Sequence, residues 1–415
     1  MTSHNSDTDR DFACGGQILV LNCGSSSIKF ALFDAGVSPL PRAPAWSGEI
    51  EGIGTATPTF GETEMKMAPV ELARDQPYHG ALAFIRRRVA LRLGKHRLAA
   101  VAHRVVHGGS KYFEPIVVDS AVLADLKTFV PLAPLHQPFA LDAIEELLIS
   151  NPGVPQIASF DTAFHQTLDK VEQMLPLPYA AWERGLRRYG FHGLSYEYMS
   201  VVLPERHGAC AHGRVIVAHL GGGASLCAMQ GVQSRATTMG FSALDGLMMG
   251  TRTGALDPGA ILYLMEVEKL TPLQVGHMLY HESGLLGISG LSSDLRVLLA
   301  NEACADEVGV RVRAALALYV RRIVREIGAL VAVLGGLDLL IFTAGVGEHS
   351  SEMRLRICRD LGFLGIMLDE EANGAHAPSI SAPASRVRVG VEPTNEEWIA
   401  AQHAASLVST AHADV

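Results

Sequence analysis

Residues Ile18–Asp34, ILVLNCGSSSIKFALFD, decide the fold, because they place a small-residue turn between two apolar runs. Ile18–Leu21 and Phe30–Phe33 have the composition of buried strands, and Cys23–Ser27 is typical of a tight turn. Glycine and serine leave backbone N–H groups uncovered and add hydroxyls, so the turn suits a phosphate. Lys29 adds a positive charge, and Asn22 offers an oxygen to the water shell of a metal. An ordinary hairpin with a polar tip explains the same residues, because glycine and serine are common in turns.

A second stretch, Arg214–Met229, has the same pattern about two hundred residues later. Its sequence, RVIVAHLGGGASLCAM, again reads as an apolar strand, a glycine and serine tip and a second apolar strand. Two such hairpins predict a duplicated fold with one phosphate-holding tip in each half, and small-molecule sites often form between two domains. The alternative is coincidence, because glycine-rich hairpins recur in unrelated proteins.

Strand-like and helix-like segments alternate along the chain, which favours α/β architecture. The spacing of apolar residues and the positions of glycine and proline predict the main elements. We expect strands at 98–106, 156–160 and 338–342, and helices at 139–149 and 310–334. Asp161 then lies at the carboxyl end of a strand.

Composition narrows the class of protein. The chain has 415 residues, 48% of them hydrophobic, which predicts two domains. A formal net charge of -9 without a basic block argues against nucleic acid as a partner. Six scattered cysteines without a C-x-x-C pair fit reduced thiols in the cytoplasm. The apolar stretch 327–342 is too short and too interrupted to span a membrane, and residues 1–14 read as a disordered leader rather than a signal peptide.

Several polar segments suit anion chemistry. Arg104 lies before a glycine corner and suits an anion clamp, although a surface salt bridge is equally compatible. His103 and His107 flank it, but on a strand their positions lie roughly 13 Å apart, too far for one zinc ion. His136 precedes a helix N-terminus, where anions bind favourably. Asp161 suits a catalytic or metal carboxylate, and helix capping is its simpler role.

The remaining candidates complete a phosphoryl-transfer set. His192 lies between glycines after two arginines, and Arg252 also lies between glycines. Glu396 is one of two glutamates that either begin a helix or bind magnesium through water. The chain has no P-loop, and the glycines 221–223 lie in a strand-turn-strand context that excludes a Rossmann fingerprint. Phosphate tips, arginines and carboxylates together favour phosphoryl transfer by positioning and charge neutralisation.

These motifs, in this order, resemble the acetate and propionate kinase family, part of the superfamily of sugar kinases, Hsp70 and actin. The matching segments are NCGSSSIKF, HRVVHGG, PLHQP, FDTAFH, RRYGFHG, MGTRTG, TAGVGE and TNEE. The resemblance implies an α/β fold of two duplicated ribonuclease H-like domains with the active site in the cleft between them. It implies an N-terminal acyl and phosphate domain at 15–165 plus 397–415, which includes the C-terminal helix, and a nucleotide-binding domain at 166–396.

The implied activity is that of acetate kinase, a phosphotransferase with a carboxyl acceptor. It transfers the ATP γ-phosphoryl reversibly and in line to acetate, giving acetyl phosphate and ADP. The resemblance implies catalytic roles for Asp161, His192, Arg252 and His136, and substrate binding by Arg104, Val106, Leu135 and Phe191. It implies ATP binding by Lys29, Ser25, Ser27, His219, Leu220, Gly221, Gly222, Gly223, Asp294, Leu295, Arg296, Gly345, Val346, Gly347, Glu348 and His349, and metal binding by Asn22 and Glu396.

The resemblance further implies Mg²⁺, with Mn²⁺ as a substitute, and ATP as co-substrate. It implies a cytoplasmic homodimer that takes part in acetyl-CoA biosynthesis, with neither nucleic acid nor membrane as a partner. An apolar wall like that of acetate-preferring members predicts acetate as the best acceptor and propionate as a poorer one.

The sequence departs from the family pattern at a few positions. Gly222 stands where the family has asparagine, and His349 where asparagine also is usual. Leu194 and Tyr196 replace a threonine and a histidine after FHG, and Ala243 replaces a proline at the acyl pocket. The first two departures bear on nucleotide affinity and on the choice of phosphate donor. The alternatives are a propionate or butyrate kinase, an inactive family member and, least of all, a nucleotide-gated binding module like Hsp70.

Overall fold

A computed structural model describes residues 16–63, 65–134 and 136–413. The chain divides into two compact units, which we describe separately. Unit 1 contains the chain up to Ala163 and from Asn395 onward, and unit 2 contains Phe164–Thr394. The predicted leader 1–14 and the candidate residue Leu135 lie outside the described residues.

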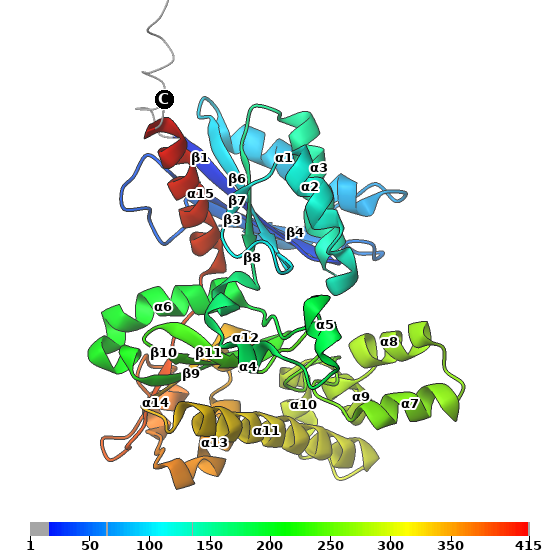
Figure 1. Cartoon of the computed structure of the whole chain (residues 1–415), viewed down its shortest axis with the longest axis vertical. Helices are drawn as coiled ribbons and strands as arrows, with labels where there is room; N and C mark the ends of the chain where they lie inside the picture. The colour runs from blue at the N-terminus through cyan, green and yellow to red at the C-terminus, as the bar shows by residue number, and fades with distance from the viewer. Residues whose placement is uncertain (1–15, 64, 135, 414–415) are drawn as a thin grey trace, which may run out of the picture. The chain divides into compact units, whose positions relative to one another are not determined.

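Unit 1 is built on an eight-stranded mixed sheet with the order β5-β4-β3-β2-β1-β6-β8-β7. Its strands are β1 (Gln17–Cys23), β2 (Ser27–Asp34), β3 (Trp46–Glu51), β4 (Thr59–Glu62), β5 (Met65–Pro69), β6 (Leu98–Val105), β7 (Ile116–Val117) and β8 (Gln156–Phe160). Its helices are α1 (Pro77–Leu93), α2 (Ser120–Lys127), α3 (Gln137–Ser150) and α15 (Glu396–Ala413). Figure 1 shows α15 on one face of this sheet and α1 and α3 on the other.

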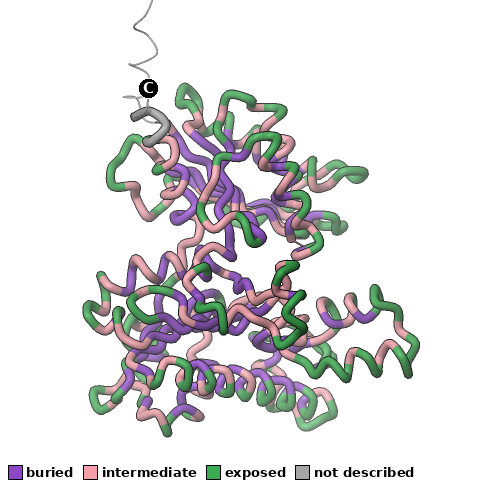
Figure 2. Tube along the Cα trace, in the orientation of Figure 1, coloured by how far each residue is buried: buried purple, intermediate pink, exposed green. Residues whose placement is uncertain are grey.

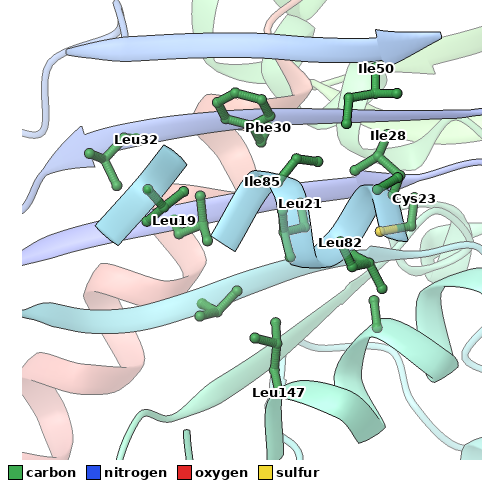
Figure 3. Packing of buried hydrophobic residues seen from close by; sticks show 14 of the residues in the cluster. Leu19, Leu21, Cys23, Ile28, Phe30, Leu32, Ile50, Leu82, Ile85 and Leu147 are labelled. Carbon is green, nitrogen blue, oxygen red and sulfur yellow. The ribbon is translucent and has the colours of Figure 1, made fainter. Parts of the chain in front are cut away.

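The opening stretch of sequence forms the centre of unit 1. Strands β1 and β2 pair antiparallel, with Asn22 opposite Lys29, and Gly24 N–H donates to Ser27 O at 2.8 Å to close the turn. Alternate residues of β1, such as Leu19 and Leu21, point into a cluster with Ile85 of α1 and with α3 (Figure 3). The predicted strand-turn-strand is confirmed, and burial on both faces explains why its strands are almost wholly apolar.

Unit 2 has a five-stranded mixed sheet with the order β11-β10-β9-β12-β13. Its strands are β9 (Arg214–Leu220), β10 (Ala224–Gln230), β11 (Gln233–Thr237), β12 (Leu339–Thr343) and β13 (Arg388–Val391). Its helices are α4 (Lys170–Gln173), α5 (Tyr179–Glu183), α6 (Gly193–His207), α7 (Pro258–Glu266), α8 (Pro272–His281), α9 (Gly284–Ser289), α10 (Leu295–Asn301), α11 (Glu307–Leu334), α12 (Ala344–His349), α13 (Ser351–Asp360) and α14 (Glu370–Gly374). Figure 2 shows the central strands of both units as continuously buried segments.

The two sheets share one strand topology. In unit 1, β3-β2-β1 are antiparallel neighbours, and β1-β6-β8 are parallel neighbours. In unit 2, β11-β10-β9 and β9-β12-β13 repeat the same orientations in the same order. The predicted duplication is therefore present in the strand order, and each copy begins with a hairpin that has a glycine-containing tip.

Long helix α11 packs against β9, β10 and β11 and buries one stripe of apolar residues. It begins at Glu307, with Asp306 as the N-cap, and ends at Gly335 in a left-handed conformation. The predicted helix at 310–334 is thus confirmed with an N-terminus three residues earlier. The glycine-rich segment that begins at Gly345 lies within the short helix α12. The described residues contain no helix whose length and apolar character suffice to cross a bilayer.

Candidate active site

In unit 1, strand ends bring four predicted site residues together. Arg104 lies on β6, Asp161 follows β8, Asn22 lies on β1 and Glu396 begins α15. The Arg104 guanidinium donates to Asp161 from Nε at 2.9 Å and from Nη2 at 2.6 Å. Its Nη1 donates to Asn22 Oδ1 at 3.3 Å, and its Nε lies 3.7 Å from Glu396 Oε2. Two carboxylates therefore converge on a single arginine, so the cluster has one negative charge in excess when both are ionised.

Burial sets the protonation of this cluster. Burial alone lowers the pKa of Arg104, but Asp161 and Glu396 together raise it above its usual range, so the guanidinium remains charged. Burial raises the pKa of Glu396 to about 7, assisted by Asp161 and opposed by Arg104. A second cation beside Glu396 would favour its ionised form, so the donor set suits a divalent metal.

The hairpin tip near this cluster presents its polar groups to solvent. Ser25 is exposed and Ser27 is half-buried. Lys29 points outward from β2, and its Nζ lies 3.7 Å from Glu49 Oε2 on the neighbouring strand β3. This ion pair is largely solvent-exposed and therefore weak, so an incoming phosphate can compete for the ammonium.

The predicted acyl and phosphoryl residues occupy several different elements. His136 is the N-cap of α3, although its side chain makes no capping hydrogen bond. Val106 is half-buried directly after β6, and Phe191 is buried in unit 2. His136 and Val106 therefore belong to unit 1, and Phe191 belongs to unit 2.

Unit 2 contains two stacked histidines. The rings of His192 and His219 lie 4.1 Å apart between centroids, with 15° between their planes. His192 is the left-handed N-cap of α6, and His219 is on β9. His219 Nδ1 lies 2.9 Å from Ser195 Oγ, which accepts a hydrogen bond of 2.9 Å from Thr394 Oγ1. The Ser195 hydroxyl therefore links His219 to Thr394 and fixes the orientation of the His219 ring through Nδ1.

A second hydroxyl chain holds His192. His192 Nδ1 lies 2.8 Å from Ser225 Oγ, and Tyr196 Oη lies 2.5 Å from the same oxygen. Ser225 is on β10, directly opposite His219 of β9. Each imidazole is therefore oriented through Nδ1 by a serine, and each serine is held by a further hydroxyl.

The glycine tip of the second hairpin lies beside His192 and Arg252. A side chain at Gly223 would bring its Cβ to 3.0 Å from His192 Nε2 and 4.0 Å from Arg252 Nη1. Gly222 differs, because no atom lies within 4 Å of the position that its Cβ would take. Arg252 donates to Ala243 O at 3.0 Å from Nη1. A side chain at Gly223 would thus crowd His192 and lie in ordinary contact with Arg252, whereas a side chain at Gly222 would meet open space.

A cavity of about 670 Å³ lies within unit 2 and collects most of the predicted nucleotide residues. Such a volume is typical of small-molecule sites. Its wall includes Gly221, Gly222, Gly250, Leu285, Ser293, Asp294, Leu295, Arg296, Leu299, Tyr319, Gly345, Val346, His349, Ser350, Ser351 and Glu352. Asp294 caps α10 and pairs with Arg296 at 2.6 Å, which lowers the pKa of Asp294.

Buried contacts fix the segment Gly345–His349 of this wall. Glu348 Oε1 accepts from Ala344 N–H at 2.8 Å and from Thr394 N–H at 3.2 Å. Arg354, which is fully buried, donates to the carbonyls of Gly347 and Glu348, each at 2.8 Å. Glu348 therefore stabilises the start of α12, whereas His349 is exposed.

The sequence alone did not identify these supporting residues. Ser195 and Tyr196 follow the FHG motif, Ser225 follows the glycine tip and Thr394 precedes the glutamate pair. All lie within or beside recognisable motifs, and this proximity is the one sign in the sequence of a role at the site. Their hydrogen-bond partners are distant in sequence, so the role itself could not be predicted. Arg188 likewise donates to the carbonyls of residues 237–239 and has a structural role.

The chain is similar to known proteins over nearly its whole length. The sequence profile described as "Acetokinase family" matches residues 17–402. The chain is 48% identical to an acetate kinase of Rhodopseudomonas palustris, over 93% of this chain and 97% of the relative. It is 46% identical to an acetate kinase of Nitrobacter hamburgensis, over 94% and 96% of the two chains.

Solved structures give the same result. A Porphyromonas gingivalis acetate kinase is 34% identical with a TM-score of 0.82, over 95% of this chain and 100% of that one. A propionate kinase from Francisella tularensis is 33% identical with a TM-score of 0.84, over 94% and 98%. These neighbours have the fold of actin, Hsp70 and sugar kinases, so the predicted fold class is confirmed. The chain belongs to the Acetokinase family.

Proposed function

We propose that this chain is an acetate kinase, which transfers the ATP γ-phosphoryl reversibly to acetate and so forms acetyl phosphate and ADP. The observation that carries the proposal is the convergence of Asp161 and Glu396 on Arg104. The family and its curated acetate kinases support the same activity. The propionate kinase neighbour makes propionate the second candidate acceptor.

The chemistry needs cations more than a general base. A carboxylate is already ionised at neutral pH, so no proton has to leave it before it attacks phosphorus. The barrier is the approach of two anions, and positioned positive charges lower it. We assign Arg104 to the carboxylate substrate, and His192 and Arg252 to the transferring phosphoryl group, with His136 on its path. Asp161 orients Arg104 and, with it, the acceptor.

The donor set in unit 1 fits Mg²⁺, with Mn²⁺ as a substitute. Asn22 supplies an amide oxygen and Glu396 a carboxylate, and the negative charge of the cluster when both carboxylates are ionised favours a hard cation. Magnesium usually takes one or two protein carboxylates together with substrate phosphates. When bound, it supplies neutralisation of phosphate charge.

The nucleotide is assigned mainly to unit 2. We propose that the tip from His219 to Gly223 binds the ATP phosphates, together with Ser25, Ser27 and Lys29 of unit 1. The residues Asp294–Arg296 and Gly345–His349 are assigned to the adenosine. Their presence in the wall of one cavity supports this assignment, with Leu220, His219, Gly347 and Glu348 adjoining it in sequence. Val106, Leu135 and Phe191 are assigned to the acyl group.

We further propose a cytoplasmic homodimer that acts in acetyl-CoA biosynthesis. Reduced cysteines are compatible with the cytoplasm, since the five described cysteines are free thiols. The relatives are nearly full-length matches, which supports a shared cellular role.

The direct test is a hydroxamate assay with ATP and magnesium across acetate, propionate and butyrate. We expect acetyl phosphate from acetate with the highest kcat/KM, and propionyl phosphate from propionate with a lower one. An absence of acyl phosphate from all three would refute the kinase assignment, and an equal kcat/KM for propionate would refute the acyl preference.

A second test is Arg252→Ala, which should lower kcat by roughly 10³-fold by analogy with arginine fingers. Arg325→Ala, on an exposed part of α11, is the matched control and should retain activity. Circular dichroism of both variants checks the fold, and an unchanged kcat for Arg252→Ala would remove this residue from the mechanism.

A further inference from the structure

Tyr319 carries a buried hydroxyl that the fold itself does not satisfy. It lies on α11, its residue is 2% exposed, and its Oη has no hydrogen-bond partner among the described residues. The neighbouring positions on the same stripe of α11 are apolar, with Ala315, Leu316 and Ile323 all buried. Tyr319 therefore occupies a core position at which phenylalanine would have the same shape.

A buried polar group without a partner requires an explanation. Such a hydroxyl loses its hydrogen bonds to water on folding and gains none in return, so it destabilises the protein. Burial also raises the pKa of Tyr319, so the group stays a neutral hydroxyl that can both donate and accept. A ligand that enters beside it would restore the missing hydrogen bond.

The surroundings of Tyr319 indicate which ligand this is. Tyr319 forms part of the wall of the 670 Å³ cavity, which also contains the backbone of Gly221 and Gly345. Apolar side chains of Leu285, Leu295 and Leu299 line the same cavity. A nucleotide matches this combination, because it joins a phosphate chain to a flat apolar ring with a hydrogen-bonding edge.

We propose that Tyr319 is a base-binding residue, whose hydroxyl hydrogen-bonds the polar edge of the nucleotide base. The inference rests on the proposed function, because it takes the cavity to be the nucleotide site. It assigns to α11 a contact that no motif of the sequence indicated. Because one hydroxyl serves as donor or acceptor, this contact accepts either the amino group or the carbonyl of a purine.

The test measures Mg·ADP binding by calorimetry in the wild-type chain and in Tyr319→Phe. We expect the variant to bind Mg·ADP roughly three- to tenfold more weakly, the effect of one hydrogen bond. Tripolyphosphate, which has neither base nor ribose, should bind both proteins equally. A 2′,3′-dideoxy analogue of ADP should also bind Tyr319→Phe more weakly than the wild type, by the same factor as ADP. If only ADP binds the variant more weakly, the hydroxyl contacts the ribose, and the proposal is overturned.

Stability provides the second readout. Without ligand, Tyr319→Phe should melt at the same temperature as the wild type or at a higher one, because an unsatisfied hydroxyl is removed. Tyr189→Phe is the matched control in the same unit, because its hydroxyl donates to Gly185 O at 2.7 Å. That control should melt about 2–4 °C lower and bind Mg·ADP normally.

The outcomes separate the two proposals. Unchanged Mg·ADP binding by Tyr319→Phe overturns the base contact. The contact is also overturned if the variant melts at a lower temperature and binds ADP and tripolyphosphate equally more weakly, because that result indicates a structural defect. If the wild type binds Mg·ADP but phosphorylates no carboxylate, the proposed function fails and the Tyr319 comparison still decides the base contact. A wild-type chain that does not bind Mg·ADP overturns both.

Discussion

The substitution Arg104→Met tests the charge balance of the unit 1 cluster. Methionine keeps an apolar stem of similar length and removes the guanidinium that donates to Asp161 at 2.9 and 2.6 Å. Asp161 would then remain as a carboxylate whose side chain is only 2% exposed, with Glu396 as a second carboxylate nearby. We therefore expect a large loss of stability in unit 1.

The magnitude follows from the burial of the pair. Removing one partner of a buried ion pair costs about 3–5 kcal/mol, because the remaining charge is uncompensated. The Arg104 side chain is 22% exposed, so water screens part of its interaction and the lower value, about 3 kcal/mol, applies. For a unit of this size that corresponds to a melting temperature roughly 6–12 °C lower.

A double-mutant cycle provides the measurement. Asp161→Asn removes the partner charge, so the double variant should be destabilised by about 2 kcal/mol less than the sum of the single variants. Tryptophan fluorescence reports on unit 1 through Trp46 and Trp398 and on unit 2 through Trp182, and circular dichroism follows the whole chain. Arg86→Met is the control, because the Arg86–Glu146 pair of 2.9 Å is more exposed and should cost at most about 1 kcal/mol.

Two results would refute this reasoning. First, Arg104→Met could melt within 2 °C of the wild type, which is a loss of at most about 1 kcal/mol on a scale of about 2–4 °C per kcal/mol. Such a result would mean that water solvates the Asp161 carboxylate well enough without Arg104. Alternatively, the effects of Arg104→Met and Asp161→Asn could simply add, which would mean that the two side chains stabilise the unit independently.

Three further predictions follow from unit 2 and from the buried histidines. Ser225→Ala removes the hydroxyl that lies 2.8 Å from His192 Nδ1 and should lower kcat about tenfold or more with little change in the KM of ATP, as measured by steady-state kinetics. Gly222→Asn places an amide where no atom lies within 4 Å, so the fold should tolerate it and the KM of ATP should fall roughly three- to tenfold. Burial lowers the pKa of His103 and of His165 to about 4, below the ordinary value of 6.5. As pH falls, the unfolded chain therefore binds a proton at each histidine before the folded chain does. Each histidine should lower the free energy of unfolding by roughly 3 kcal/mol between pH 6.5 and pH 4, and the urea midpoint should fall accordingly.

Local sequence patterns predicted the hairpins and the positions of the main elements, with ends that differ by up to three residues. The apolar runs around Gly24 and around Gly222 became β1-β2 and β9-β10, because a strand-turn-strand unit is fixed by residues close together in the chain. Strand β8 spans the predicted residues 156–160, and Asp161 follows it directly. Once both hairpins were known, duplication was the simplest account of their similarity, and the shared strand order agrees with it.

Contacts between distant segments could not be predicted in this way. Thr394 and Ser195 are 199 residues apart, yet their hydroxyls lie within 2.9 Å. The glycine-rich segment at Gly345 forms the short helix α12, in which Glu348 accepts from Ala344 N–H and buried Arg354 donates to the carbonyl of Gly347. Glycine has a low helix propensity, and these hydrogen bonds outweigh it.

The two hydroxyl chains explain why sequence motifs place serine, rather than a carboxylate, beside His192 and His219. A carboxylate at Nδ1 would orient an imidazole equally well, but it would add negative charge next to the groups assigned to phosphate. Ser225 and Ser195 orient the rings without that charge. In a site where the proposed barrier is repulsion between anions, a neutral partner adds no negative charge and leaves the charge of Arg252 available to the phosphoryl group. Tyr196 stands where the family pattern has a histidine, but its hydroxyl lies 2.5 Å from Ser225 Oγ. It therefore holds Ser225 beside His192 without adding a charge to the site.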